Sequence, residues 1–228
     1  MKRSEVESYV EWARGLIKDC GMKLPGFGYW TIDDWKTDVE KKDRMIRSML
    51  GWDITDYGMG DFLKIGSVLF TIRNGVFGDS SIGTPYAEKL LPTMDGQRLP
   101  LHFHYSKCED IINRGGGDMW IKLYNSKKDE SVDYESDVTV YMDGLAHTVA
   151  AGDTLIVKKG ESISLTPGMY HTFGAVEGRG DLLVGEVSSI NDDNVDNHFA
   201  EEVRRFAKIV EDVPIRTPLM NEYDEVLR

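Results

Sequence analysis

The chain has 228 residues, of which 41% are apolar, and its formal net charge at pH 7 is −12. This apolar content is typical of a globular protein, and an acidic surface repels phosphate backbones, so we expect no nucleic-acid partner. No apolar run approaches the roughly 20 residues that a membrane-spanning helix needs, and no apolar signal core follows the N-terminus. We therefore expect no membrane partner and a cytoplasmic location, with Cys20 and Cys108 as reduced thiols.

The first part of the chain is predicted to be helical. Ser4 and Glu7 have the spacing of a capping box, and apolar residues then recur at helical spacing until Gly21 ends the pattern. A second helix is predicted to start after Thr31, and a third to run over about 41–50.

From about Asp61 the pattern changes to short strands. Asn74-Gly75, Asp95-Gly96 and Asp143-Gly144 are predicted turns between β-branched and aromatic runs. Many short strands without intervening helices favour an antiparallel sandwich or jelly roll. Another helix is predicted near the C-terminus, because Phe199, Val203, Phe206, Ala207 and Val210 fall on one helical face.

We expect a single structural domain that is mainly β. Residues 1–60 form a helical extension packed on a barrel, residues 61–190 form the barrel, and residues 191–228 form a C-terminal helical segment.

Four residues are candidate metal ligands. His102 and His104 lie two positions apart in a predicted strand, so both imidazoles point the same way and can clamp one ion. Glu109 shares this face only if the chain bends between His104 and Glu109, and His171 follows a Pro-Gly turn. A lone buried histidine is usually a hydrogen-bonded core residue, but three histidines with a glutamate favour a metal site over that structural role.

These residues match two motifs of the cupin superfamily. The first, Gly-x5-His-x-His-x3–4-Glu-x6-Gly, fits the chain from Gly96 to Gly116 at every element. The second keeps its glycine at Gly168 and its histidine at His171, whereas Ala175 replaces its asparagine. The chain thus resembles the cupins, which implies a double-stranded β-helix, or jelly-roll barrel, holding a metal with the four candidate ligands.

Three imidazoles and one carboxylate form a ligand set for borderline or hard divalent cations. An octahedral ion held by four protein ligands leaves two adjacent positions for neighbouring oxygens of a substrate, whereas zinc prefers four tetrahedral ligands. We favour Mn²⁺, with Fe, Co, Ni or Zn also compatible.

Longer runs of residues are similar to the D-lyxose isomerases, one group of cupins. They are 1–5, 29–31, 83–89, 102–117, 186–193 and 196–199. The resemblance implies an aldose–ketose isomerase, an intramolecular oxidoreductase that interconverts D-lyxose and D-xylulose, and also D-mannose and D-fructose. Its metal would chelate O1 and O2 of the open-chain sugar, and an enediolate would form between C1 and C2.

Such a reaction needs a base that moves a proton between C1 and C2. Lys107 and Glu109 stand beside the histidines in the sequence. Glu109 is both a candidate ligand and a candidate proton carrier. The resemblance favours Lys107 together with Glu201 or Glu202 on the predicted C-terminal helix.

Tyr86, Lys89 and Arg205 are candidates for substrate binding. The first two precede the Asp95-Gly96 turn, and Arg205 lies on the predicted C-terminal helix. The alternative for the lysine is a solvated strand edge, and for Arg205 a surface ion pair with Glu201.

Two other functions are compatible with these motifs: an Fe(II) dioxygenase that consumes oxygen, and a sugar-binding cupin without activity. Four intact ligands count against the second. No cluster of basic residues suggests a sugar phosphate, so we expect a simple monosaccharide as substrate. A homodimer is expected because two-fold pairs are the commonest closed assembly.

Overall fold

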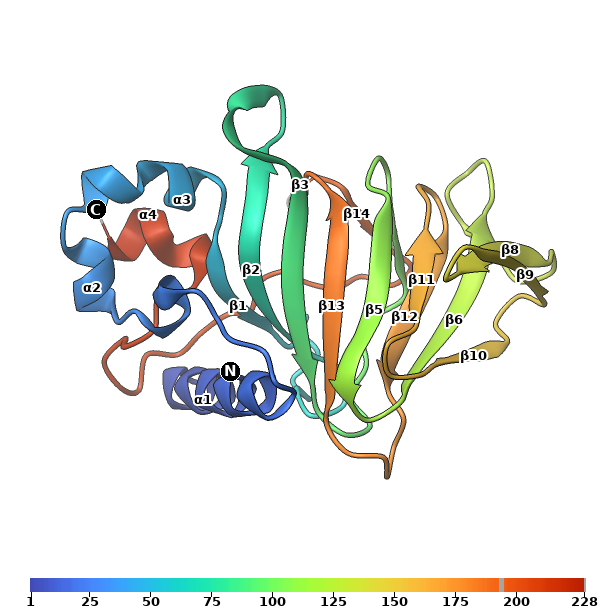
Figure 1. Cartoon of the computed structure of the whole chain (residues 1–228), viewed down its shortest axis with the longest axis horizontal. Coiled ribbons are helices and arrows are strands. Elements are labelled where there is room, and N and C mark those ends of the chain that lie inside the picture. Colours follow the sequence, from blue (N-terminus) through green and yellow to red (C-terminus); the bar gives the residue numbers. More distant parts are fainter. Residues whose placement is uncertain (193–194, 228) are drawn as a thin grey trace.

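The computed structural model describes residues 1–192 and 195–227. Two curled β-sheets lie one behind the other, and the helices gather beside β1 and β2, where both ends of the chain also lie (Figure 1). None of the described helices is long and apolar enough to cross a membrane.

The helices are α1 (Arg3–Asp19), α2 (Ile32–Lys36), α3 (Asp43–Arg47) and α4 (Tyr223–Val226), with 3-10 turns at Gly26–Tyr29, Val39–Lys42 and Met220–Glu222. The strands are β1 (Gly51–Thr55), β2 (Ser67–Val76), β3 (Asp79–Thr93), β4 (His102–His104), β5 (Glu109–Gly116), β6 (Met119–Ser126), β7 (Val132–Asp133), β8 (Val138–Met142), β9 (Leu145–Val149), β10 (Thr154–Val157), β11 (Ser162–Leu165), β12 (Tyr170–Ala175), β13 (Leu182–Ser189) and β14 (Asn197–Phe199).

The two sheets enclose the main core. In the larger sheet the strand order is β1-β2-β3-β13-β5-β11-β8-β9, and in the smaller it is β10-β6-β12-β4-β14, with β7 paired to β6. One apolar cluster joins Ile111 and Val184 of the larger sheet to Ile121 and Phe173 of the smaller. The predicted fold class, a mainly β barrel of two sheets with helices towards both ends of the chain, is confirmed.

Helix α1 packs its apolar face on the larger sheet, but its predicted cap is wrong. The helix starts two residues earlier, where the backbone N–H of Lys2 donates to Glu5 Oε2 at 2.6 Å. Ser4 instead donates to Asp212 Oδ2 at 2.7 Å, and Glu7 accepts two backbone N–H groups of the C-terminal segment. Tertiary contacts therefore use the side chains that the local pattern assigns to capping.

The predicted second and third helices are present as the short α2 and α3. Thr31 and Asp34 form the capping pair of α2, in which the Thr31 N–H donates to Asp34 Oδ2 at 2.9 Å.

The predicted turn at Asn74-Gly75 is wrong, because both residues lie inside β2 and the chain reverses at Phe77-Gly78. Asn74 is buried, and its side-chain amide exchanges two hydrogen bonds with the backbone of Asn191, at 2.9 and 3.0 Å. Because its side chain has these backbone partners, Asn74 can lie inside a strand although asparagine favours turns. The chain does turn at Asp95-Gly96 and Asp143-Gly144.

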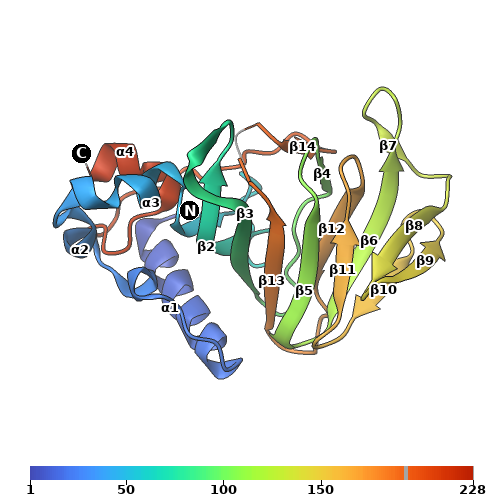
Figure 2. The ribbon, with the colours of Figure 1, turned by 45° about the horizontal axis from the view of Figure 1, so that its top comes forward.

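The helix predicted over Phe199–Val210 is absent, and the C-terminal helix is α4 instead. Phe199 ends β14, which pairs with β4 (Figure 2), and the Ala200 N–H donates to Leu101 O at 2.9 Å. The Arg204 N–H donates to Tyr57 O at the same distance. These long-range backbone bonds replace the helical ones, so tertiary context overrides the local periodicity. We name residues 195–205 the strap.

Candidate active site

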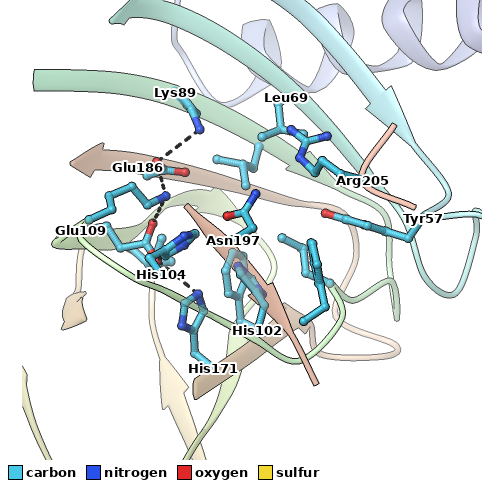
Figure 3. A pocket seen from close by; sticks show the side chains of 16 residues that line it. Tyr57, Leu69, Lys89, His102, His104, Glu109, His171, Glu186, Asn197 and Arg205 are labelled. Atoms are coloured by element: carbon cyan, nitrogen blue, oxygen red, sulfur yellow. Dashed lines mark hydrogen bonds and ion pairs between the residues drawn. The ribbon is translucent and has the colours of Figure 1, made fainter. Parts of the chain in front are cut away.

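A cavity between the two sheets is lined by the buried lysine, histidine and glutamate side chains of the barrel (Figure 3). One side, which we name the strand wall, consists of β4, β12 and β5. The other includes the strap, with Asn197, Phe199 and Arg205.

Three histidines of the strand wall converge because of strand geometry. His102 and His104 lie on the same face of β4, while Phe103 packs against Tyr170 on the opposite face. His171 of β12 is the register partner of His102, and their ring centroids are 4.2 Å apart. All three are buried, and one ring nitrogen from each lies within 4.8 Å of the others.

Backbone carbonyls set the orientation of two of these rings. Nδ1 of His102 lies 2.9 Å from Pro100 O, and Nδ1 of His171 lies 3.0 Å from Met169 O. A carbonyl oxygen can only accept, so each Nδ1 carries the proton and each Nε2 carries a lone pair, as in metal-binding histidines.

Glu109 joins the histidines from the other sheet. The chain leaves β4 after His104, bends over 105–108 and enters β5 at Glu109. Glu109 Oε1 then lies 3.2 Å from Nε2 of both His104 and His171. The bend that the sequence analysis required is therefore present.

The protonation states suit cation binding. Burial lowers the pKa of His102 well below its ordinary value, and the neighbouring His171 and His104 lower it further. Burial, with the Lys107 ammonium, also lowers the pKa of His104. Burial acts to raise the pKa of Glu109, but Lys107 and His104 outweigh it and hold this pKa well below the ordinary range. Neutral imidazoles beside an ionised carboxylate are the forms that bind metals.

The surroundings of two buried polar atoms show whether the site fits a cation. Glu109 Oε1 and His171 Nε2 are buried 3.2 Å apart, and neither has a hydrogen-bond partner among the described residues. Both carry lone pairs, so no hydrogen bond can join them, whereas a cation between them can bind both. The residues present therefore fit a divalent metal ion.

A second group of charges lies beside the histidines. Lys107 Nζ is 2.7 Å from Glu109 Oε2 and 3.1 Å from Glu186 Oε1, and Lys89 Nζ is 3.5 Å from the same Glu186 oxygen. All four side chains are buried. Burial acts to raise the pKa of Glu186, but Lys107 and Lys89 outweigh it and lower this pKa. Glu186 is thus an ionised carboxylate within the cavity.

Arg205 projects into the cavity from the strap, on the other side from the histidines (Figure 3). Its Nη1 donates to Oδ2 of the buried Asp53 at 2.6 Å. The ion pair joins the strap to β1.

A family model described as D-lyxose isomerase matches residues 1–223. The chain belongs to the D-lyxose isomerase family. It is 42% identical over 228 residues to a D-lyxose/D-mannose isomerase of Escherichia coli O157:H7, and 41% identical over 224 residues to one of Serratia proteamaculans. Each match covers 98% of both chains. The predicted enzyme class, an aldose–ketose isomerase, is confirmed.

Solved structures of more distant proteins share the fold. An L-ribose isomerase of Acinetobacter sp. DL28, in complex with L-ribose, has a TM-score of 0.59 at 14% identity. An L-ribose isomerase of Geodermatophilus obscurus has a TM-score of 0.56 at 16% identity. Each similarity covers 92% of this chain and 98% of the other, and it extends to both the barrel and its helices.

In this member of the D-lyxose isomerase family, the cavity contains most of the predicted site residues. They are His102, His104, Lys107, Glu109, His171, Lys89 and Arg205. Tyr86 is 44% exposed and does not line the cavity. Glu201 and Glu202 are exposed and also lie outside the cavity lining, because the helix that was to present them is absent.

Three polar cavity residues, and Asp53 beside the cavity, were not predicted from the sequence. Glu186 left a signal, since it is a charged residue in the otherwise apolar and small-residue run of β13. Tyr57 lies outside any predicted element. Asn197 belongs to the strap, and Asp53 pairs with Arg205 of the strap. Neither was predicted, because the periodicity of this segment indicated a helix.

Proposed function

We propose that this protein is a metal-dependent isomerase that interconverts D-lyxose and D-xylulose, and also D-mannose and D-fructose. The observation that carries the proposal is the convergence of three buried histidines and Glu109 beside a buried pair of Lys107 and Glu186. The names of the relatives from E. coli and S. proteamaculans support the choice of sugars.

His102, His104, Glu109 and His171 would hold the ion, and we favour Mn²⁺ because the donor set lacks thiolate. When bound, such an ion supplies Lewis acidity at the sugar carbonyl and makes the neighbouring C–H more acidic.

We assign the proton transfer to Glu186 and Lys107. The Glu186 carboxylate takes the proton from C2 of the aldose, whose C1 carbonyl becomes the enediolate, and then returns it to C1 as the C2 carbonyl forms. The hydroxyl proton must pass from O2 to O1 in the same cycle. Lys107, placed between the two carboxylates, is the group that donates and accepts there. In this proposal Glu186 takes the role that the family resemblance implied for Glu201 or Glu202.

Arg205 and Asn197 face the cavity from the strap, and we assign them to the sugar hydroxyls away from the reacting carbons. Arginine has five N–H donors, so a guanidinium that holds Asp53 can also donate to a hydroxyl. Lys89 contacts Glu186, and we assign it to that carboxylate rather than to the sugar.

The experiment that tests the proposal is turnover after metal exchange. The protein is stripped with chelator, Mn²⁺ is restored, and ketose is measured from D-lyxose and from D-mannose. We expect activity to vanish with the metal and return with it. Metal-loaded protein that forms ketose from neither sugar would refute the proposal.

We also infer that the protein is a homodimer. Edge strand β9 is exposed along most of its length, and Leu145 on it is 69% exposed, which an interface would cover. Light scattering in solution measures the mass directly, and a monomer at micromolar concentration would refute this inference.

A further inference from the structure

Asp196 lies outside the cavity lining but binds the bend that leads to it. This buried carboxylate accepts three hydrogen bonds: Oδ1 from the backbone N–H of Ser106 at 2.8 Å and from its hydroxyl at 2.7 Å, and Oδ2 from the N–H of Lys107 at 3.2 Å. The Tyr105 N–H donates to the backbone oxygen of Asp196 at 3.1 Å. One strap residue thus binds three consecutive residues of the bend.

The bend needs such a partner because it lies between the two sheets. Residues 105–108 follow β4 and precede β5, and the N–H groups of Ser106 and Lys107 donate to the Asp196 side chain rather than to a strand. A buried N–H group without an acceptor is costly, and the Asp196 carboxylate supplies the acceptor for the buried N–H of Lys107. It also accepts from the N–H of the exposed Ser106.

The position of Lys107 Nζ depends on this anchorage. A lysine side chain is long and flexible, so its charged end is placed only when its backbone is fixed and its partners are in reach. Lys107 Nζ lies within 3.1 Å of carboxylate oxygens of both Glu109 and Glu186. Among the residues that the structure describes, Asp196 forms no ion pair with a side chain, so it acts on Lys107 through the backbone.

We propose that Asp196 is a positioning residue for Lys107. By binding the bend, the strap holds the lysine ammonium between Glu109 and Glu186, where the isomerisation requires it. This inference rests on the proposed function for the role of Lys107, but the placement of the lysine can be tested without turnover.

The first test compares Asp196→Asn with Asp212→Asn. Asp212 is a matched control, because its carboxylate also accepts from the N–H and hydroxyl of a distant serine, Ser4, at 3.0 and 2.7 Å, yet it lies outside the cavity lining. A misplaced catalytic group commonly costs up to about 100-fold in rate, so we expect kcat of D196N to fall about 10- to 100-fold with KM and metal content little changed. D212N should keep the parent kcat.

A double-mutant cycle separates positioning from general stability. If Asp196 acts through Lys107, then D196N adds little further loss of kcat in a Lys107→Gln background. Additive losses, an equal loss in D212N, or a D196N protein that has lost its metal would each overturn the proposal.

A crystal structure of D196N supplies the readout that is independent of activity. We expect Lys107 Nζ to have left at least one of its two carboxylates. If the lysine keeps both contacts, Asp196 does not position it. Should the parent protein isomerise neither sugar, the proposed function fails, while the position of Lys107 in D196N still decides this inference.

Discussion

The strand wall and the strap form the same cavity but are held in place by different interactions. His102, His104 and His171 lie on paired strands, where the backbone ladder itself aligns the side chains. The strap has only the short β14 as regular structure, and a few backbone hydrogen bonds hold it together with two carboxylate contacts: Asp53 with Arg205, and Asp196 with the bend over 105–108. The comparison suggests that the strand wall provides metal binding, and that the strap aligns groups for proton transfer and sugar recognition.

The largest effect should come from the strand wall. His104→Ala removes one of the converging imidazoles, so we expect the protein to lose its metal and its isomerase activity while it remains folded. Metal content by mass spectrometry, ketose formation and circular dichroism measure the three quantities. His147→Ala, outside the cavity lining, is the matched control and should keep the metal content and turnover of the parent. Full turnover by a metal-free H104A protein would contradict the assignment of the metal site.

The next effect concerns Lys107, which lies on the bend between β4 and β5. Lys107→Met should lower kcat by about 10²- to 10⁴-fold, the usual contribution of a positioned proton carrier, while metal stays bound. Steady-state kinetics and metal content measure this. Removing the buried Lys107 also takes away the cation that Glu109 and Glu186 share, so Lys107→Arg is the variant that keeps the charge. Near-parent kcat in both variants would remove Lys107 from the mechanism.

A smaller effect is expected where the strap meets the sugar. Asp53→Asn and Arg205→Lys should each lower kcat/KM by about 10- to 100-fold, mainly through KM, because a hydrogen bond to a charged donor is lost or misaligned. The control is Arg47→Lys, at the exposed ion pair of Arg47 with Asp79. Initial rates with D-lyxose and D-mannose over a range of concentrations show how the loss divides between kcat and KM. An unchanged KM for both sugars would mean that Arg205 does not bind substrate.

The strand wall should also make the metal-free protein sensitive to acid. The pKa values of His102 and His104 are lower in the folded chain than their ordinary value of 6.5. Below about pH 6.5 the unfolded chain takes up protons that the folded chain does not, so stability is full above this pH and falls as the pH decreases. Chemical denaturation at pH 7.5, 6.5 and 5.5 should show this loss, and a His102→Gln, His104→Gln variant should show a smaller one. Equal losses in both proteins would refute the assignment.

The smallest effect is expected on the exposed side of the strap. Glu201→Gln and Glu202→Gln alter side chains outside the cavity lining, so kcat and KM should change by less than about twofold and stability by less than about 0.5 kcal/mol. Kinetics and thermal unfolding measure both. A loss of tenfold or more in kcat would show that the strap turns one of these glutamates inward during turnover.

Local sequence pattern predicted the parts of this protein that depend on strand alternation and motif spacing. His102 and His104 share a face because alternate residues of a strand must do so, and the motif spacing placed Glu109 and His171 beside them. The same kind of reasoning failed for Asn74 and for Phe199–Val210, where a local turn or helix signal competes with buried, long-range hydrogen bonds.

By itself, then, the sequence determined the barrel, the strands that present the histidines and the family to which the chain belongs. Only the tertiary structure decided that Glu186, Asn197 and Arg205 face the candidate metal ligands, and that Asp53 and Asp196 hold the strap. The physical reason is the separation along the chain over which each kind of interaction acts. Alternation and turn chemistry act between neighbours, whereas Asp53 and Arg205 stand 152 positions apart and meet only after the sheets have formed.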